Sequence, residues 1–148
     1  MAGRPLIGRR RWAWMLLCCL WVCLVLFSST SLAGQWADFA FHAIIGSAGT
    51  AMNDHFTGVV HLIADKGFHV FMFAVLALLL SQVFEARTRS TVASVLVIAG
   101  MVGISSEVLQ AFFPDRDPAI RDVLINFTGA LLGVLINLQV PRKAEYTA

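Results

Sequence analysis

The chain has few charged residues, and this scarcity is its most informative feature. Only 14% of its 148 residues are charged, whereas 58% are apolar. Soluble domains carry about 25% charged and about 45–50% apolar residues. So few charges do not cover the water-exposed surface of a domain of this size. The composition therefore excludes an ordinary soluble protein and indicates a chain that lies in lipid.

The chain also lacks the residue sets that several known chemistries require. Its three cysteines, Cys18, Cys19 and Cys23, lie in one apolar run and make no disulfide framework. Basic residues are not interleaved with aromatic ones, so we expect no nucleic-acid partner. The sequence has no glycine-rich phosphate loop, HExxH motif or nucleophile motif. The candidate metal ligands are one histidine, His69, and three carboxylates, Asp65, Glu107 and Asp122. Their spacing matches no recognised ligand motif, so we predict no metal ion and no cofactor.

Four stretches are long and apolar enough to cross a membrane. A hydrocarbon core of about 30 Å takes roughly 20 helical residues to span. The stretches are 12–32, 59–84, 91–113 and 122–140, with an outer connection at 33–58. The sequence therefore predicts an all-α, polytopic membrane protein of about four transmembrane helices, in a single domain over residues 1–148.

Basic residues in short loops predict the orientation of these helices. They are Arg9, Arg10 and Arg11 before the first helix, Arg87 and Arg89 after the second, and Arg142 and Lys143 after the fourth. With four spans, all three groups fall on the same side, which the positive-inside rule assigns to the cytoplasm. We therefore predict a multi-pass protein of the inner (cytoplasmic) membrane, N-in and C-in.

The first apolar stretch has a second interpretation. Its basic start and its ending, Ser31-Leu32-Ala33, also fit a cleavable signal peptide. We favour a retained helix, and either outcome leaves the orientation of the other helices unchanged. In the connection that follows, Trp36, Phe39 and Ala43 fall on one helical face, which predicts a short interfacial helix.

Polar residues inside the predicted helices are the second informative feature. An ionisable side chain costs about 2.5–3.5 kcal/mol at the centre of a bilayer, so such residues usually face the protein interior and mark a site. Counted from their helix ends, those of the last three helices fall at a similar depth on the outer side. With a loop arginine above them, they are Asp65, Lys66, His69, Glu107, Gln110, Arg116, Asp122 and Asn126. We predict that these eight residues form one ligand-binding pocket, in which Lys66, Arg116 and protonated His69 balance the carboxylates.

Small residues and a proline predict how the last helix packs and begins. Gly129 and Gly133 give a small-xxx-small spacing on the face that carries Asp122, which allows a neighbouring backbone to come close. The pair Asp117-Pro118 is typical of an N-cap followed by a first-turn proline.

The polar residues also resemble those of a known family. The pattern runs Asp65-Lys66-x-x-His69-x-x-x-Phe73, then Glu107-x-x-Gln110-x-Phe112-x-Pro114-x-Arg116, then Asp122-x-x-x-Asn126-x-x-Gly129. In order, spacing and membrane context it resembles the VanZ-like family of small bacterial membrane proteins, over about half of the chain. The resemblance implies a cell-envelope membrane domain of four to five helices, a link to teicoplanin-type glycopeptide antibiotic resistance, and functional polar positions on the same eight residues.

Three functions remain open from the sequence. We favour the binding or remodelling of a lipid-linked or headgroup ligand, such as a cell-wall precursor, at the outer leaflet, where Lys66 and Arg116 would contact a phosphate. The alternatives are an intramembrane enzyme that uses His69 and Glu107 as acid and base on a lipid, and a purely structural or assembly role. Membrane lipids are expected partners in each case.

Overall fold

Four long helices make up nearly all of the structure. The computed structural model describes residues 6–32, 34–36, 39, 40, 43, 54–114, 116 and 118–141. The helices are α1 (Leu6–Ser28), α3 (Asp54–Val83), α4 (Arg89–Gln110) and α5 (Ile120–Gln139). Each contains an apolar stretch long enough to cross a membrane. The prediction of an all-α fold with four membrane helices is confirmed, and the described part of the chain contains no strand.

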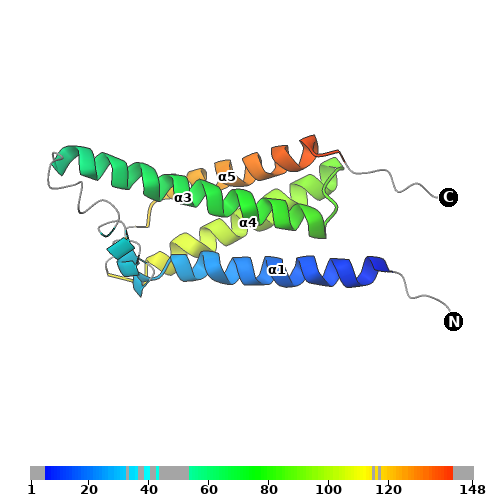
Figure 1. Ribbon diagram of the computed structural model, residues 1–148, viewed down its shortest axis with the longest axis horizontal. Helices are drawn as coiled ribbons and strands as arrows, with labels where there is room; N and C mark the ends of the chain where they lie inside the picture. Colours follow the sequence, from blue (N-terminus) through cyan, green and yellow to red (C-terminus); the bar gives the residue numbers. More distant parts are fainter. Residues whose placement is uncertain are drawn as a thin grey trace.

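The helices run up and down along one axis (Figure 1). The end of α1, the start of α3, the end of α4 and the start of α5 lie at one end of the bundle. The start of α1, the turn between α3 and α4 and the end of α5 lie at the other end. This order follows from four long helices joined by connections that each reverse the chain.

The closest helix packing is between α3 and α5, and it depends on two glycines. A Cβ atom at Gly129 would collide with the carbonyl oxygen of Val70, and one at Gly133 with that of Ala74. Only residues without a side chain allow two backbones to approach so closely. The glycine spacing predicted this contact, and the contact brings the polar residues of α3 next to those of α5.

Side-chain hydrogen bonds hold α1 and the turn that follows it against the rest of the bundle. The Trp21 indole donates to the carbonyl of Met72 in α3, at 2.9 Å. The Ser29 and Ser106 hydroxyls lie 2.8 Å apart, and both residues are buried. Inside a membrane, such polar contacts supply much of the specificity of helix pairing, because lipid removes the hydrophobic drive between helices.

The helix ends differ from the predicted stretches by one to six residues, and two of the differences lie beside the polar residues. Helix α4 ends at Gln110, three residues before the predicted end at residue 113, because the proline at 114 disfavours helical backbone before it. Helix α5 begins at Ile120, so the prediction that Pro118 is its first residue is wrong. Its N-cap is Ala119, in an extended conformation, and Asp117 lies outside the described residues.

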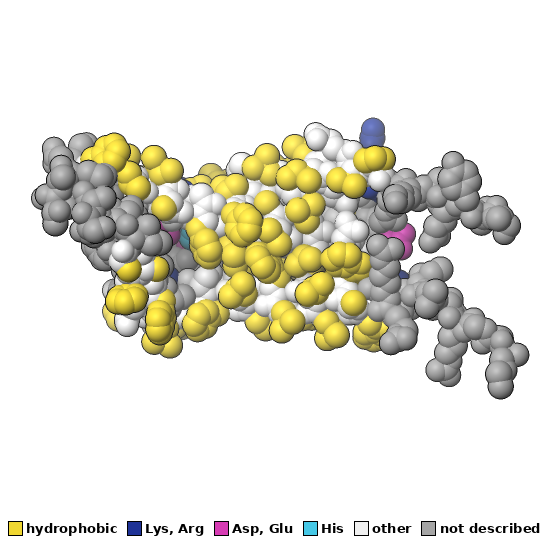
Figure 2. Space-filling view, in the orientation of Figure 1, with side chains coloured by type: hydrophobic (Ala, Val, Ile, Leu, Met, Phe, Trp, Pro, Cys, Tyr) yellow, Lys and Arg dark blue, Asp and Glu magenta, His cyan; other side chains and the backbone are white. Residues whose placement is uncertain are grey.

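Large apolar side chains cover the middle of the molecule (Figure 2). Each helix contributes exposed ones, among them Leu20, Ile63, Met101 and Leu124. A continuous apolar surface of this kind is unstable in water and suits contact with lipid tails. Of the three cysteines, Cys19 and Cys23 are exposed on this surface and Cys18 is buried, all as free thiols.

Candidate functional site

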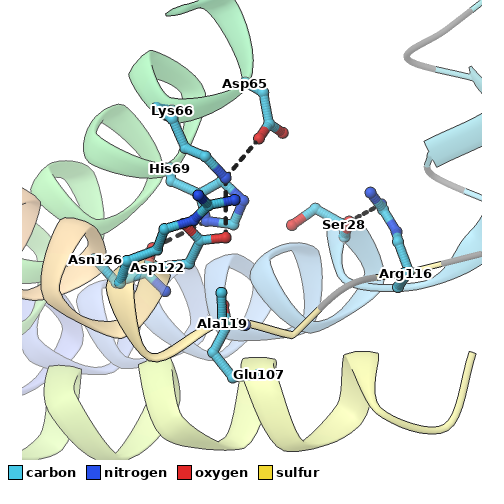
Figure 3. A network of polar contacts seen from close by, with 10 residues as sticks. Ser28, Asp65, Lys66, His69, Glu107, Arg116, Ala119, Asp122 and Asn126 are labelled. Carbon is cyan, nitrogen blue, oxygen red and sulfur yellow. Dashed lines mark hydrogen bonds and ion pairs between the residues drawn. The ribbon is translucent and has the colours of Figure 1, made fainter. Parts of the chain in front are cut away.

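The polar side chains of α3, α4 and α5 gather at one end of the bundle (Figure 3). This end lies where α3 and α5 begin and α4 ends. Four of the residues are less than a tenth exposed: Glu107, Gln110, Asp122 and Asn126. We refer to the eight residues predicted above, Asp65, Lys66, His69, Glu107, Gln110, Arg116, Asp122 and Asn126, as the polar cluster.

Lys66 joins α3 to α5 through two carboxylates. Its Nζ lies 3.0 Å from Oδ2 of Asp65 and 2.9 Å from Oδ2 of Asp122. The Asp122 side chain is only 7% exposed, whereas Lys66 is 23% and Asp65 38% exposed. A buried carboxylate needs such a partner, because an uncompensated charge in an apolar interior is costly. The ion pairs therefore run from an open edge at Asp65 to a buried end at Asp122.

His69 and Asn126 make a second link between α3 and α5. His69 Nδ1 lies 3.0 Å from Asn126 Oδ1. Because an amide oxygen only accepts hydrogen bonds, this contact has the proton on Nδ1. Asn126 is 1% exposed, and its amide nitrogen has no hydrogen-bond partner. Gly103 of α4 packs against it, since a Cβ there would lie in ordinary contact with the Asn126 Cβ, at 3.5 Å.

Glu107 connects α4 to the start of α5. Its Oε2 accepts a hydrogen bond from the backbone N–H of Ala119, at 3.1 Å. The first N–H groups of a helix lack partners within it, and alanine has no side chain to cap them. Glu107 therefore binds a backbone donor that the local sequence leaves free. Its Oε1 is buried without a partner. Within the part of the chain that the structure describes, the buried Gln110 side chain makes no hydrogen bond.

Arg116 does not pair with a carboxylate of the cluster. Its guanidinium donates to the backbone carbonyls of Ser28, at 2.9 Å, and Thr30, at 3.1 Å. The last carbonyls of a helix accept no hydrogen bond within it, so the oxygen of Ser28 is open to the loop arginine, whereas that of Thr30 also accepts from the Gly34 N–H, at 3.2 Å. Gly34 lies against the same group, since a Cβ there would be 3.0 Å from Arg116 Cζ. The expected charge balance through Arg116 is thus replaced by a link between α1 and the loop that joins α4 to α5.

Four polar atoms of the cluster are buried without a hydrogen-bond partner among the residues that the structure describes. They are the acceptors Glu107 Oε1 and Asp122 Oδ1 and the donors Asn126 Nδ2 and Arg116 Nε, and the fifth such atom, Ser81 Oγ, lies outside the cluster. Each unpaired buried group costs about 1–3 kcal/mol, and folded proteins have few of them. Three of the four atoms, on Glu107, Asp122 and Asn126, lie where α4 and α5 meet, whereas Arg116 lies apart beside Ser28 (Figure 3).

The described residues do not include a set of three or more His, Cys, Asp or Glu side chains placed to hold a metal ion. Carboxylates and a histidine are present, but Lys66 already occupies one oxygen of Asp65 and one of Asp122. The arrangement therefore offers hydrogen bonds and charge to a polar group of a ligand.

The sequence reasoning missed several polar contacts that hold the helices together. Ser29 pairs with Ser106 beside the cluster, and at the far end Asn137 bonds to Gln82 and to the carbonyl of Ala86. A signal for Asn137 was present, because it follows Asn126 by eleven residues and lies on the same stripe of α5. The serines gave no such signal, since small hydroxyl residues are common in membrane helices.

Comparison with known proteins agrees with the pattern of polar residues. The chain is 35% identical over 77 residues to an uncharacterized protein of Schizosaccharomyces pombe, an alignment that covers 51% of this chain and 48% of that protein. The chain thus spans about half the length of this relative, and the likeness reaches beyond bacteria. No solved structure matches the chain. The sequence model of the VanZ/LLP1 family matches residues 14–140, nearly the whole helical part. This multi-pass membrane chain therefore belongs to the VanZ/LLP1 family.

Proposed function

We propose that the chain binds or remodels a lipid-linked or headgroup ligand at the outer leaflet of the membrane, through the polar cluster. The observation that carries this proposal is the group of buried atoms without hydrogen-bond partners: Glu107 Oε1, Asp122 Oδ1 and Asn126 Nδ2. They come from two helices that meet at one end of the bundle. A ligand with polar groups of its own would supply the missing partners, because leaving them unpaired is unfavourable.

The depth of the cluster suits a lipid headgroup. Glu107 lies three residues before the end of α4, and Asp122 lies two residues after the start of α5. At helical rise these positions are about 3–5 Å from the helix ends, near the headgroup region. The exposed aromatic residues Trp36 and Phe39 lie at the same end of the bundle, in edge-to-face contact at 6.4 Å. Aromatic residues of this kind are typical of the boundary between lipid tails and water.

The charges of the loops favour the outer leaflet. Arg87 and Arg89 lie at the end of the bundle opposite to the cluster. Basic residues are enriched on the cytoplasmic side, so the cluster would face away from it. In the inner membrane, a ligand there is a phospholipid headgroup or a lipid-linked precursor of the cell envelope. On this account, teicoplanin-type resistance is a consequence of handling such an envelope lipid.

The members of the cluster on α3 are more exposed than those on α4 and α5. Asp65 and Lys66 are partly exposed, and acidic and histidine side chains show through beside the start of the helices in Figure 2. A shallow hollow of about 360 Å³ is lined by Gln35, Trp36 and Phe39, which follow the end of α1 in the sequence. A headgroup would reach the buried atoms by the open edge at Asp65.

Lipid retained by the purified protein tests the proposal. We expect the wild-type chain, extracted in a mild detergent, to keep about one lipid molecule that mass spectrometry of the intact complex detects. Asp122→Asn should lose that lipid, because it weakens the ion pair with Lys66 and replaces the carboxylate that would contact the ligand by a neutral amide. The matched control is Glu85→Gln, a carboxylate-to-amide change in the turn at the opposite end. A folded Asp122→Asn protein that keeps the same lipid would contradict the proposal.

A second candidate is an intramembrane enzyme that acts on such a lipid. It rests on the His69 ring, whose Nδ1 is fixed by Asn126 at 3.0 Å, and on the unpaired oxygen of Glu107. A fixed imidazole and a buried carboxyl are suited to proton transfer. Incubation of the purified chain with a panel of membrane lipids tests this candidate. If a product forms and His69→Ala abolishes its formation, the enzyme candidate is supported. If none of the lipids in the panel is converted, binding alone is favoured.

A further inference from the structure

We infer that the group which enters the polar cluster is a primary ammonium, as in an ethanolamine lipid headgroup, rather than a phosphate. The inference rests on the proposed function and names the chemistry of its ligand. It reverses the expectation that Lys66 and Arg116 contact a phosphate, because both cations are already engaged.

The charges of the cluster leave a cation missing. Three carboxylates, Asp65, Glu107 and Asp122, stand against one ammonium, Lys66, which bonds to the first and the last of them. The other cations do not complete the balance. Arg116 donates to backbone carbonyls of α1, and Arg121 is 73% exposed and 3.8 Å from Asp122. Within the described residues, therefore, the buried Glu107 carboxyl forms no ion pair.

Two carboxylate oxygens of the cluster lack a hydrogen-bond donor. Glu107 uses Oε2 for the Ala119 N–H, and Asp122 uses Oδ2 for Lys66. The remaining oxygen of each carboxyl, Oε1 and Oδ1, is buried without a hydrogen-bond partner, and the exposed Arg121 side chain makes only a long ion pair with Asp122 Oδ1, at 3.8 Å. Both side chains are more than nine-tenths buried, so water does not reach these oxygens freely.

An ammonium group would supply both the missing positive charge and the missing hydrogen-bond donors. It carries one positive charge and three N–H donors, and hydrogen bonds between two ionised groups are the strong ones. A phosphate would add negative charge beside the unpaired oxygens of Glu107 and Asp122, and it could accept hydrogen bonds only from the unpaired donors Asn126 Nδ2 and Arg116 Nε. Figure 3 shows Glu107 extending from α4 toward the start of α5. Asp122 lies there, and Lys66 reaches it from α3. The amine would take its place near these two carboxyls as a second ammonium beside Lys66.

A series of methylated headgroups tests the inference without changing the protein. Wild-type protein in nanodiscs of phosphatidylcholine is offered phosphatidylethanolamine, its N-methyl and N,N-dimethyl derivatives, and phosphatidylglycerol, all with the same acyl chains. Lipid retained after mild extraction is counted by mass spectrometry. We expect phosphatidylethanolamine to be enriched at least about tenfold over phosphatidylcholine, since two charge-assisted hydrogen bonds separate them. The N-methyl lipid, with two N–H donors left, should stay close to the parent.

A protein variant gives the second arm. Glu107→Gln keeps an oxygen for the Ala119 N–H but removes the charge, so we expect it to lose the enrichment while its thermal unfolding stays near that of the wild type. The control is Glu85→Gln, which should keep the enrichment. If Glu107→Gln does not fold, the methylation series on the wild type decides alone. Competition with free ethanolamine shows whether the ammonium alone is recognised. If free ethanolamine displaces the lipid, the amine is recognised by itself. If it does not, the whole lipid headgroup is recognised.

The contrary outcomes are distinct. Equal retention of all the methylated lipids, or a preference for phosphatidylglycerol that Lys66→Met removes, would overturn the ammonium assignment and leave the proposed function in place. Retention of no lipid at all by the wild type would overturn the proposed function, and the ammonium assignment with it.

Discussion

Two asparagines on α5 show how a site differs from a structural contact at the scale of single residues. Asn137 uses both ends of its amide, since Gln82 donates to its oxygen and its nitrogen donates to the carbonyl of Ala86. Asn126 uses only its oxygen, toward His69, and its nitrogen is buried without a partner. Both side chains are almost fully buried. Unpaired atoms, and not burial, therefore distinguish Asn126 from Asn137, and among the described residues Ser81 Oγ is the one such atom outside the polar cluster.

The same substitution at both asparagines separates the two roles. Asn137→Ala should lower the free energy of unfolding by about 1–3 kcal/mol, because it leaves a carbonyl and an amide unpaired. Asn126→Ala should cost less, since it breaks one bond and removes one unpaired group, but it should reduce lipid retention. Thermal unfolding and mass spectrometry in the same detergent measure both effects. Equal losses of stability, with retention unchanged in both, would mean that the cluster is a scaffold.

At this scale, the sequence placed some of the polar residues together but did not predict the partners of others. Depth along the helices and polarity were enough to bring together Asp65, Lys66 and Asp122, which the structure joins by ion pairs. Arg116 was expected to neutralise a carboxylate, because a count of charges does not include backbone carbonyls. The carbonyls at the end of α1 lie 86 and 88 residues away in the sequence and become neighbours only through the fold.

At the scale of helices, the contact between α3 and α5 depends on the absence of side chains. At Gly133 a Cβ would meet the Ala74 carbonyl, with its carbon at 3.0 Å, and backbone atoms do not move aside. At Gly100 of α4 nothing lies within 4 Å. The two glycines thus provide a contact position and a matched open position.

Gly133→Ala should destabilise the bundle, and Gly100→Ala should not. We expect a loss of about 1–3 kcal/mol for the first, as for overpacked cores, because α3 and α5 must separate. The second should be neutral or gain up to about 1 kcal/mol from helix propensity. Unfolding in detergent followed by circular dichroism measures the difference. Similar stability of the two variants would contradict the close contact.

Two arginines tie helix ends together at opposite ends of the bundle. Arg116 bonds to the carbonyls of Ser28 and Thr30, and Arg87 bonds to those of Leu138 and Val140. Removing either guanidinium should free only the helix end that it holds. We expect Arg116→Ala to speed backbone hydrogen exchange over residues 28–34, and Arg87→Ala to speed it over 138–141.

Mass spectrometry of peptides from the exchanged protein measures both segments in both variants. Each arginine variant serves as the control for the other. If exchange rises over the whole chain in Arg116→Ala, then this arginine supports the fold generally, and its specific hold on α1 is disproved.

The sequence predicted the helices better than their ends. Long apolar runs are visible locally, and so is the glycine spacing of α5. The start of α5 was not predicted accurately, because Pro118 fits a first helical turn on local grounds but precedes the observed start at Ile120, and the apolar stretch was taken only from residue 122. The backbone N–H of its N-cap residue, Ala119, donates instead to Glu107 on another helix, at 3.1 Å. A cap supplied by a distant residue leaves no local signal.

At the scale of the whole molecule, the polar cluster and the basic turn lie at opposite ends of an apolar bundle. Arg87 and Arg89 border the turn between α3 and α4, at the end where α1 begins and α5 ends. We therefore predict that both termini face the cytoplasm. Reporter domains fused to either end should both be active only inside. Activity of the C-terminal reporter outside would reverse the orientation and place the cluster on the inner leaflet.

The measurement that tests the central claim most directly is a map of headgroup contacts. A phospholipid with a photoreactive group in its headgroup is reconstituted with the full chain, illuminated, and the labelled peptides are identified. We predict labels concentrated in the peptides that contain Lys66 and His69, Glu107, and Asp122 and Asn126. Labels spread evenly along the lipid-facing helices, or gathered near Gln82 and Asn137, would contradict a headgroup site in the polar cluster.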